Sequence, residues 1–290
     1  MAIMNDKQFK KVFNETIFEK SKSDLLEKIS KSPNRYIGLF RPTKPKAKIL
    51  QNLLQSHEIR FGDAFEKIIE EYLRIKGCTN LCKSFTLNNE TLKIDQCFSK
   101  RENGEERVFF IEQKVRDDHD STKKRGQIEN FEKKLNVMIG KYEEEKIVGI
   151  FYFIDPDLTK NKNFYQDELE RMSQDYNVKT YIFYGKELFD FLGFSDVWKE
   201  ILKYLAEWKK DIPDLPEVNF DLDAQHTFDE IKDLPPSVFR KLLENEEIFN
   251  EIVLTLFPQK QTLRLLSEYY RTKTDTIHQT IANKISKYLD

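Results

Sequence analysis

The distribution of apolar and polar residues predicts a set of strands in the middle of the chain. Residues 92–99 and 107–115 are rich in β-branched and aromatic side chains, as strands are. Shorter runs of the same kind predict strands at residues 83–87 and 178–184. Residues 147–154 are almost entirely apolar, which is typical of a central strand that is buried on both faces.

Helical periodicity precedes and follows these strands. One apolar stripe predicts a helix over about residues 60–75, and a second predicts a helix that Asp120 or Ser121 caps. The members of the second stripe are Ile128, Phe131, Leu135, Met138 and Tyr142. Further helices are expected at residues 164–176, 187–192 and 197–210. Strands and helices that alternate in this way predict a mixed α/β fold.

A tight turn between two of the strands brings charged residues together. Asn103-Gly104 is a strong signal for a two-residue hairpin loop, because both turn residues adopt positive φ. With the loop at these residues, Asp95 lies directly opposite Glu112, and Lys114 shares their face of the hairpin. The opposite face is mostly apolar and is expected to cover the core; it carries Ile94, Gln96, Phe98, Phe109, Ile111 and Val115.

Two carboxylates in cross-strand positions repel each other, and a fold normally avoids that arrangement. A divalent cation between Asp95 and Glu112 would reverse the sign of the interaction, because hard cations such as Mg²⁺ prefer carboxylate oxygens. Lys114 would then be placed to orient an attacking water or to help deprotonate it. The alternative is a surface hairpin whose charges are simply solvated.

Asp95 followed by Glu112-x-Lys114 resembles the motif of the PD-(D/E)xK nucleases, and the chain looks like a type II restriction endonuclease. Ile94 stands where that motif has proline, a residue with no catalytic atom. The resemblance covers about residues 58–195. It implies a restriction-endonuclease-like fold, in which a central mixed β-sheet is flanked by helices. Outside that range, the residues themselves predict a helical N-terminal region and a helical C-terminal subdomain.

The same resemblance assigns roles to individual residues. It implies that Asp95 and Glu112 bind Mg²⁺, with the backbone carbonyl of Gln113 as a further ligand. It also implies that Lys114 contacts the scissile phosphate or the attacking water and stabilises developing negative charge.

One further acidic residue belongs to the resemblance. The segment Arg60-x-Gly62-x-x-x-Glu66 is similar to a helix start that is common in the superfamily, in which the glutamate often lies near the metal. Glu66 would then join the catalytic residues through a second metal or a water. The alternative is a helix glutamate that faces solvent.

The segment between the second hairpin strand and the following helix is a candidate DNA contact. It is unusually polar and ends in a basic cluster at a helix N-terminus, where backbone N–H groups and the helix dipole favour phosphate. The candidate DNA-binding residues are Arg116, Asp117, Asp118, His119, Ser121, Lys123, Lys124, Arg125 and Gln127. A metal role for His119 is disfavoured, because no second histidine lies near it in the sequence.

Charge is unevenly distributed along the chain. The formal net charge of −2 argues against a protein that binds nucleic acid over its whole surface. Residues 1–57 nevertheless carry a net charge of +7, and residues 211–233 carry −7. This separation suits a protein with one face toward phosphates and an acidic connector elsewhere, and solvated helix faces of opposite sign are the alternative.

Composition and proline-marked breaks divide the chain into four expected parts. These are a basic helical N-terminal region at 1–57, a nuclease core at 58–210, an acidic Pro-containing connector at 211–225 and a helical C-terminal subdomain at 226–290. The last part could contact DNA or a second subunit, or have a purely structural role. No secretory signal or membrane span is visible, and the three cysteines are expected to be free thiols in a reducing cytoplasm.

The expected function is that of a Mg²⁺-dependent type II restriction endonuclease, which hydrolyses phosphodiester bonds in double-stranded DNA at a specific short sequence. By its family, such an enzyme would act as a homodimer and would be paired with a cognate DNA methyltransferase. The alternatives are a nonspecific or repair-type PD-(D/E)xK nuclease and a non-catalytic DNA-binding helical protein.

Overall fold

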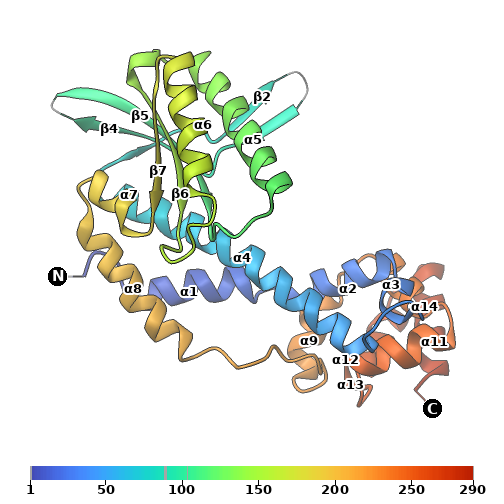
Figure 1. Ribbon diagram of the computed structural model, residues 1–290. Coiled ribbons are helices and arrows are strands. Elements are labelled where there is room, and N and C mark those ends of the chain that lie inside the picture. Colours follow the sequence, from blue (N-terminus) through green and yellow to red (C-terminus); the bar gives the residue numbers. More distant parts are fainter. Residues whose placement is uncertain (1, 88–89, 103, 290) are drawn as a thin grey trace. The chain divides into compact units, whose positions relative to one another are not determined.

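The chain forms two units, one built on a β-sheet and one built of helices. A computed structural model describes residues 2–87, 90–102 and 104–289, and Figure 1 shows their helices and strands. The first unit comprises Met1–Phe13 and Gly62–Asp211, and the second comprises Asn14–Phe61 and Ile212–Asp290. Helix α4 (Pro45–Ile75) therefore contributes residues to both units.

The sheet of the first unit is mixed, with strand order β1-β4-β5-β6-β7. Its strands are β1 (Thr79–Asn80), β4 (Gln96–Glu102), β5 (Glu105–Lys114), β6 (Ile147–Phe153) and β7 (Lys179–Tyr184). The pairs β1–β4 and β4–β5 are antiparallel, whereas β5–β6 and β6–β7 are parallel. A separate two-stranded sheet pairs β2 (Ser84–Leu87) with β3 (Glu90–Lys93). The prediction of a central mixed sheet flanked by helices is thus confirmed.

The register of the hairpin is the predicted one. Glu102 pairs with Glu105 and Gln96 pairs with Ile111, so the chain reverses where the sequence indicates. Asn103 of the predicted turn lies outside the described residues, and Gly104 has the positive φ of 89° that the turn requires. The single strand predicted at residues 92–99 is wrong, because the chain bends at Asp95 and divides into β3 and β4.

Helices cover both faces of the sheet. On the face that carries Glu112, α5 (Ser121–Ile139) and α6 (Lys162–Asp175) pack on a core that includes Phe110, Phe131 and Phe151. On the other face, the stacked rings of Phe98 and Phe109 are fully buried. The apolar face of the hairpin thus covers a core as expected, and the face of Glu112 packs on a core as well; Figure 1 shows α5 and α6 lying along the sheet.

Short helices complete the first unit. They are α1 (Asp6–Ile17, shared with the second unit), the 3₁₀ turn Glu144–Lys146, α7 (Lys186–Phe191) and α8 (Ser195–Lys209). Aromatic side chains of α1, α4 and α8 meet at Phe13, whose ring lies 5.3 Å from Phe65 and 5.0 Å from Trp208 between centroids. The helix predicted through Tyr142 ends earlier, at Ile139.

The regular secondary structure of the second unit is entirely helical in its described residues. It contains α2 (Ser21–Lys31), α3 (Asn34–Ile37), α9 (Ala224–Ile231), α10 (Pro236–Leu242), α11 (Glu246–Ile248), the π-helical turn Phe249–Val253, α12 (Leu254–Leu256), α13 (Gln261–Arg271) and α14 (Thr276–Lys287). One buried core joins α2, α3 and the start of α4 to α9–α14. Residues 14–61 thus pack with the C-terminal helices and do not form an N-terminal region of their own. None of the helices in the described parts of the chain is long and apolar enough to cross a membrane.

Candidate active site

Asp95 lies at the bend where the chain passes from the small sheet into the large one. The backbone N–H of Ile94 donates to the carbonyl oxygen of Lys83, so the chain is still paired with β2 at this point. One residue later, Oδ2 of Asp95 accepts a hydrogen bond of 2.7 Å from the backbone N–H of Gln113 in β5. The Asp95 carboxylate therefore accepts the backbone N–H of Gln113 just beyond the last β4–β5 pair, and this hydrogen bond holds it beside the end of β5.

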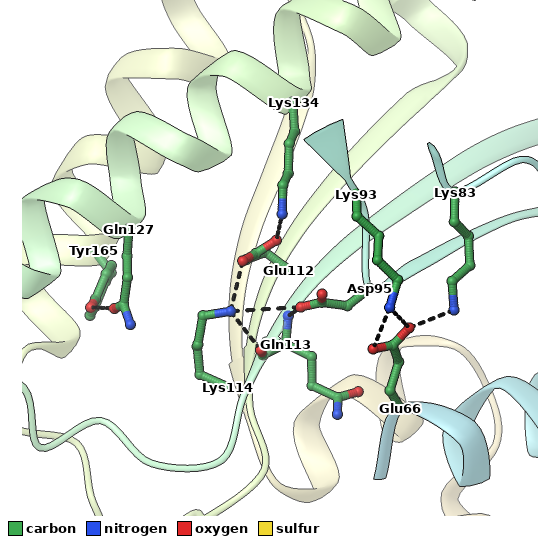
Figure 2. A network of polar contacts seen from close by, with 10 residues as sticks. All are labelled: Glu66, Lys83, Lys93, Asp95, Glu112, Gln113, Lys114, Gln127, Lys134 and Tyr165. Carbon is green, nitrogen blue, oxygen red and sulfur yellow. Dashed lines mark hydrogen bonds and ion pairs between the residues drawn. The ribbon is translucent and has the colours of Figure 1, made fainter. Parts of the chain in front are cut away.

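Glu112 is almost completely buried, with 3% of its surface exposed, and two lysines hold its carboxylate. Lys114 Nζ lies 2.7 Å from Glu112 Oε1, and Lys134 Nζ of α5 pairs with Glu112 Oε2. Lys114 Nζ also lies 2.9 Å from the carbonyl oxygen of Gln113 and 3.7 Å from Asp95 Oδ2. Figure 2 shows these contacts converging on the end of β5. The structure thus brings Asp95, Glu112 and Lys114 together, as their spacing predicted.

The electrostatics of this cluster follow from burial and proximity. Burial and the neighbouring charge of Glu112 raise the pKa of Asp95, and Lys114 opposes that shift only in part. Burial would lower the pKa of Lys114, but Glu112 and Asp95 outweigh it and hold the pKa above its ordinary value. Lys114 is therefore protonated at neutral pH, which suits it to bind negative charge and not to accept a proton.

The donors present fit a single magnesium ion. Asp95 and Glu112 repel each other, and a divalent cation between them would relieve that repulsion. Mg²⁺ in proteins is typically held by one or two carboxylates and several waters. The carbonyl oxygen of Gln113 lies in the same cluster, since it accepts a hydrogen bond from Lys114. Among the residues that the structure describes, three or more acidic, histidine or cysteine side chains nowhere gather into a metal cage. The residues that would hold the ion are Asp95, Glu112 and the backbone of Gln113, and water and phosphate would complete its coordination.

Glu66 is held apart from this cluster by other lysines. Its Oε1 lies 2.8 Å from Lys83 Nζ and 3.3 Å from Lys93 Nζ. Within the described chain, no hydrogen bond or ion pair joins Glu66 to Asp95, Glu112 or Lys114, and Figure 2 shows the two groups as separate sets of contacts. The backbone oxygen of Glu66 accepts a hydrogen bond of 2.6 Å from Gln96, which anchors α4 at the start of β4. In this structure the Glu66 carboxylate thus pairs with Lys83 and Lys93, and its catalytic role through a second metal or a water stays a prediction.

Asp117, one of the predicted DNA-binding residues, is fully buried. Its carboxylate accepts hydrogen bonds from the backbone N–H and the side-chain amide of Asn161, at 2.7 and 2.8 Å, and from the hydroxyl of Tyr184 at 2.9 Å. A carboxylate so enclosed presents no oxygen to DNA in this structure, which speaks against the predicted DNA contact of Asp117. It ties the loop after β5 to the segment before α6 and to the end of β7.

The other predicted DNA-binding residues lie around the start of α5. Asp120 caps the helix by accepting a hydrogen bond from the backbone N–H of Lys123, as the sequence indicated. The exposed members of the set are Arg116, Asp118, Ser121, Lys123 and Arg125. Three members are partly covered: the Lys124 ammonium lies 4.3 Å from the centre of the Phe164 ring, Gln127 accepts a hydrogen bond from Tyr165, and burial lowers the pKa of His119. A neutral His119 at neutral pH adds no positive charge to this surface.

Lys134 is the site residue that the sequence analysis missed. It is 5% exposed and stands among the apolar residues that α5 turns toward the sheet. The available signal was its spacing, because Lys134 lies three residues after Phe131 and four before Met138, within the predicted apolar stripe. A lysine on the buried face of a helix needs a partner, and the helix covers the strand of Glu112.

Comparison with known proteins identifies a family whose model matches most of the chain. The family model described as "Type II restriction endonuclease, HinfI" matches residues 5–96 and 75–209 of the chain. These segments include the sheet, the Asp95, Glu112 and Lys114 cluster, and α5 with Lys134. A search of curated proteins found no match.

Proposed function

The chain belongs to the HinfI family of type II restriction endonucleases, and on this premise we propose that it cleaves double-stranded DNA at a specific short sequence in a Mg²⁺-dependent reaction. The observation that carries the proposal is the meeting of Asp95, Glu112 and Lys114 at the end of β5. Two acidic ligands beside a protonated lysine suit hydrolysis of a phosphodiester, in which negative charge develops on the phosphate.

The two lysines of the site have different reach, and we assign them different roles. The side chain of Lys114 is 27% exposed, so it can turn from Glu112 toward a bound phosphate. Lys134 belongs to α5, and its side chain is buried between that helix and the sheet. It therefore stays paired with Glu112 and keeps that carboxylate in one orientation. When bound, Mg²⁺ would polarise the scissile phosphate. Asp95 is fixed through Oδ2 by the Gln113 N–H, and its other oxygen would be the one to hold the ion.

The exposed residues at the start of α5 complete the proposal. Lys123 and Arg125 would contact phosphates near the cleaved bond, whereas Arg116 and Asp118 lie on the loop that follows β5. Cleavage of both strands of a symmetric site would be carried out by a two-fold homodimer. A cognate DNA methyltransferase would protect the same sequence on the host's own DNA in the cytoplasm.

Digestion of unmodified bacteriophage DNA tests the proposal. With Mg²⁺ we expect discrete fragments with common end sequences, and with EDTA we expect none. Lys114→Ala should reduce the cleavage rate by roughly a hundredfold or more. Lys133→Ala, an exposed lysine on the neighbouring helix, is the matched control and should cut normally.

Other outcomes would assign the protein differently. A smear of fragments would indicate a nonspecific nuclease of the same superfamily. DNA binding without cleavage, unchanged by Asp95→Ala, would indicate a non-catalytic DNA-binding protein and would overturn the proposal.

A further inference from the structure

The loop between α3 and α4 carries the most exposed large apolar side chains among the described residues. Leu39 is 97% exposed and its neighbour Phe40 is 104% exposed. Single apolar residues on a surface are common, but two adjacent ones that touch nothing are unfavourable in water unless something covers them. The loop belongs to the second unit, whereas Asp95, Glu112 and Lys114 belong to the first.

The base of this loop is anchored. Tyr36 before it and Ile49 after it are 4% and 0% exposed, and both belong to the core of the second unit. Pro42 lies within the loop and Pro45 opens α4, and each restricts the backbone. The tip is therefore presented outward from a packed base, so that little conformational entropy is lost when it binds a partner.

The surroundings of the tip are strongly basic. Residues 28–48 contain seven lysines and arginines and no acidic residue. Within the described chain, Arg35, Arg41, Lys44 and Lys46 form no ion pair. Burial raises the pKa of the Tyr36 hydroxyl, and the charges of Arg35 and Arg41 oppose that shift, which places both arginines near the base of the loop. An apolar tip thus projects from an uncompensated positive surface.

We propose that this loop is a second DNA contact, in which the basic residues bind phosphates while Leu39 and Phe40 wedge into the minor groove and partly unstack a base step. Apolar wedges of this kind are used by proteins that kink DNA, and phosphate contacts fix their position. A second copy of the chain fits less well, because a two-fold contact would oppose two like-charged segments. The proposal rests on the proposed function in taking duplex DNA as the substrate.

The first test measures DNA binding in EDTA, where cleavage cannot occur. The probes are a short duplex that carries the sequence mapped from the digest and a random duplex of equal length. Leu39→Ser/Phe40→Ser should weaken binding roughly tenfold, because the variant has no apolar side chain to place against a base face. The matched control is Leu215→Ser/Leu222→Ser, two exposed leucines of the acidic connector in the same unit, which should bind like the wild type.

A second measurement detects the wedge itself. With 2-aminopurine placed in turn along the duplex, the wild type should raise its fluorescence at one step, since unstacking relieves quenching, and the double variant should not. Arg41→Gln/Lys44→Gln/Lys46→Gln should lower the slope of log affinity against log salt by about 0.9 for each phosphate that the variant no longer neutralises. Unchanged affinity together with no fluorescence difference would overturn the proposal.

Two further outcomes would reassign the surface and so overturn the proposal. If the double variant becomes monomeric in sedimentation while its DNA affinity is unchanged, the loop binds a second copy. If it no longer binds anionic vesicles while its DNA affinity is unchanged, the loop binds lipid. Failure of the proposed nuclease function is distinguishable, because it would appear as wild-type protein that does not cut with Mg²⁺, whereas the loop is tested without cleavage.

Discussion

Lys134→Met tests the buried pair that holds Glu112. The substitution keeps an unbranched side chain that is one atom shorter and removes its charge, so that packing changes little. Lys134 and Glu112 are 5% and 3% exposed, and breaking a pair so buried costs about 3–5 kcal/mol because one charge is left uncompensated. Lys114 remains 2.7 Å from Glu112 Oε1 and compensates in part. We therefore expect a loss of stability near the lower end, about 3 kcal/mol.

Urea denaturation in EDTA, followed by tryptophan fluorescence, is a suitable assay. The chain has two tryptophans, Trp198 and Trp208, and both lie in α8 of the first unit, so their fluorescence reports the unfolding of the unit that contains the site. Lys133→Met on the same helix is the matched control. Lys133 is exposed, and its substitution should change the free energy of unfolding by less than about 0.5 kcal/mol.

The double variant Lys134→Met/Glu112→Gln separates the effect of charge pairing from that of packing. With both charges removed, most of the stability should be recovered, because no buried ion remains without a partner. The two substitutions should therefore be strongly non-additive. A destabilisation below about 1 kcal/mol for Lys134→Met, or a double variant destabilised by the sum of the single effects, would refute the pairing described here.

Three further predictions concern the first unit. Asp95→Asn should raise the urea midpoint of the metal-free protein at neutral pH, because the raised pKa of Asp95 means that its charged form destabilises the fold. This gain should vanish as pH falls below about 4, the pKa of Asp95 in the unfolded chain. A lowered midpoint at neutral pH would contradict the prediction. A thiol reagent should label Cys82 alone in the native protein, since Cys78 and Cys97 are buried and burial raises the pKa of Cys97 to about 12; rapid labelling of all three would contradict it. Asp117→Ala should lower the free energy of unfolding by about 1–3 kcal/mol in the same urea assay, because it leaves the buried donors of Asn161 and Tyr184 without an acceptor. An unchanged midpoint would show that these donors find another acceptor.

The hairpin could be predicted because its determinants are local. A turn signal at Gly104 and the period of two along each strand are enough to place Asp95 opposite Glu112. The break at Asp95 could not be predicted in the same way. It depends on β2, since Ile94 pairs with Lys83 instead of continuing along β5, and such a partner cannot be identified from the periodicity of one segment.

The division into units also depends on contacts between segments far apart in the sequence. The proline breaks of the N-terminal region indicate where helices end but not what they pack against. Tyr36 and Ile49 are buried against helices that begin after residue 223. One helix was predicted over about residues 60–75, separate from the basic helical region expected at 1–57, whereas α4 runs without a break from Pro45 to Ile75. Ile49 and Leu53 are buried and have helical spacing, but two residues are too few to show that the helix before residue 57 continues into the helix at 60–75.

Lys134 belongs to the site but not to the sequence motif of Asp95, Glu112 and Lys114, so the motif alone does not describe the charges of the site. The sequence pairs two carboxylates with one lysine, a cluster whose net negative charge by itself favours a bound metal ion. The structure supplies a second lysine from a helix 22 residues further along the chain, so that two acids and two lysines balance without any ion. The two lysines offset part of the repulsion between the carboxylates, although burial and the charge of Glu112 still hold the pKa of Asp95 above its ordinary value. It follows that an ion entering the site must compete with two ammonium groups for Glu112. Only the more exposed of these, Lys114, can be drawn away by the phosphate of a bound DNA strand.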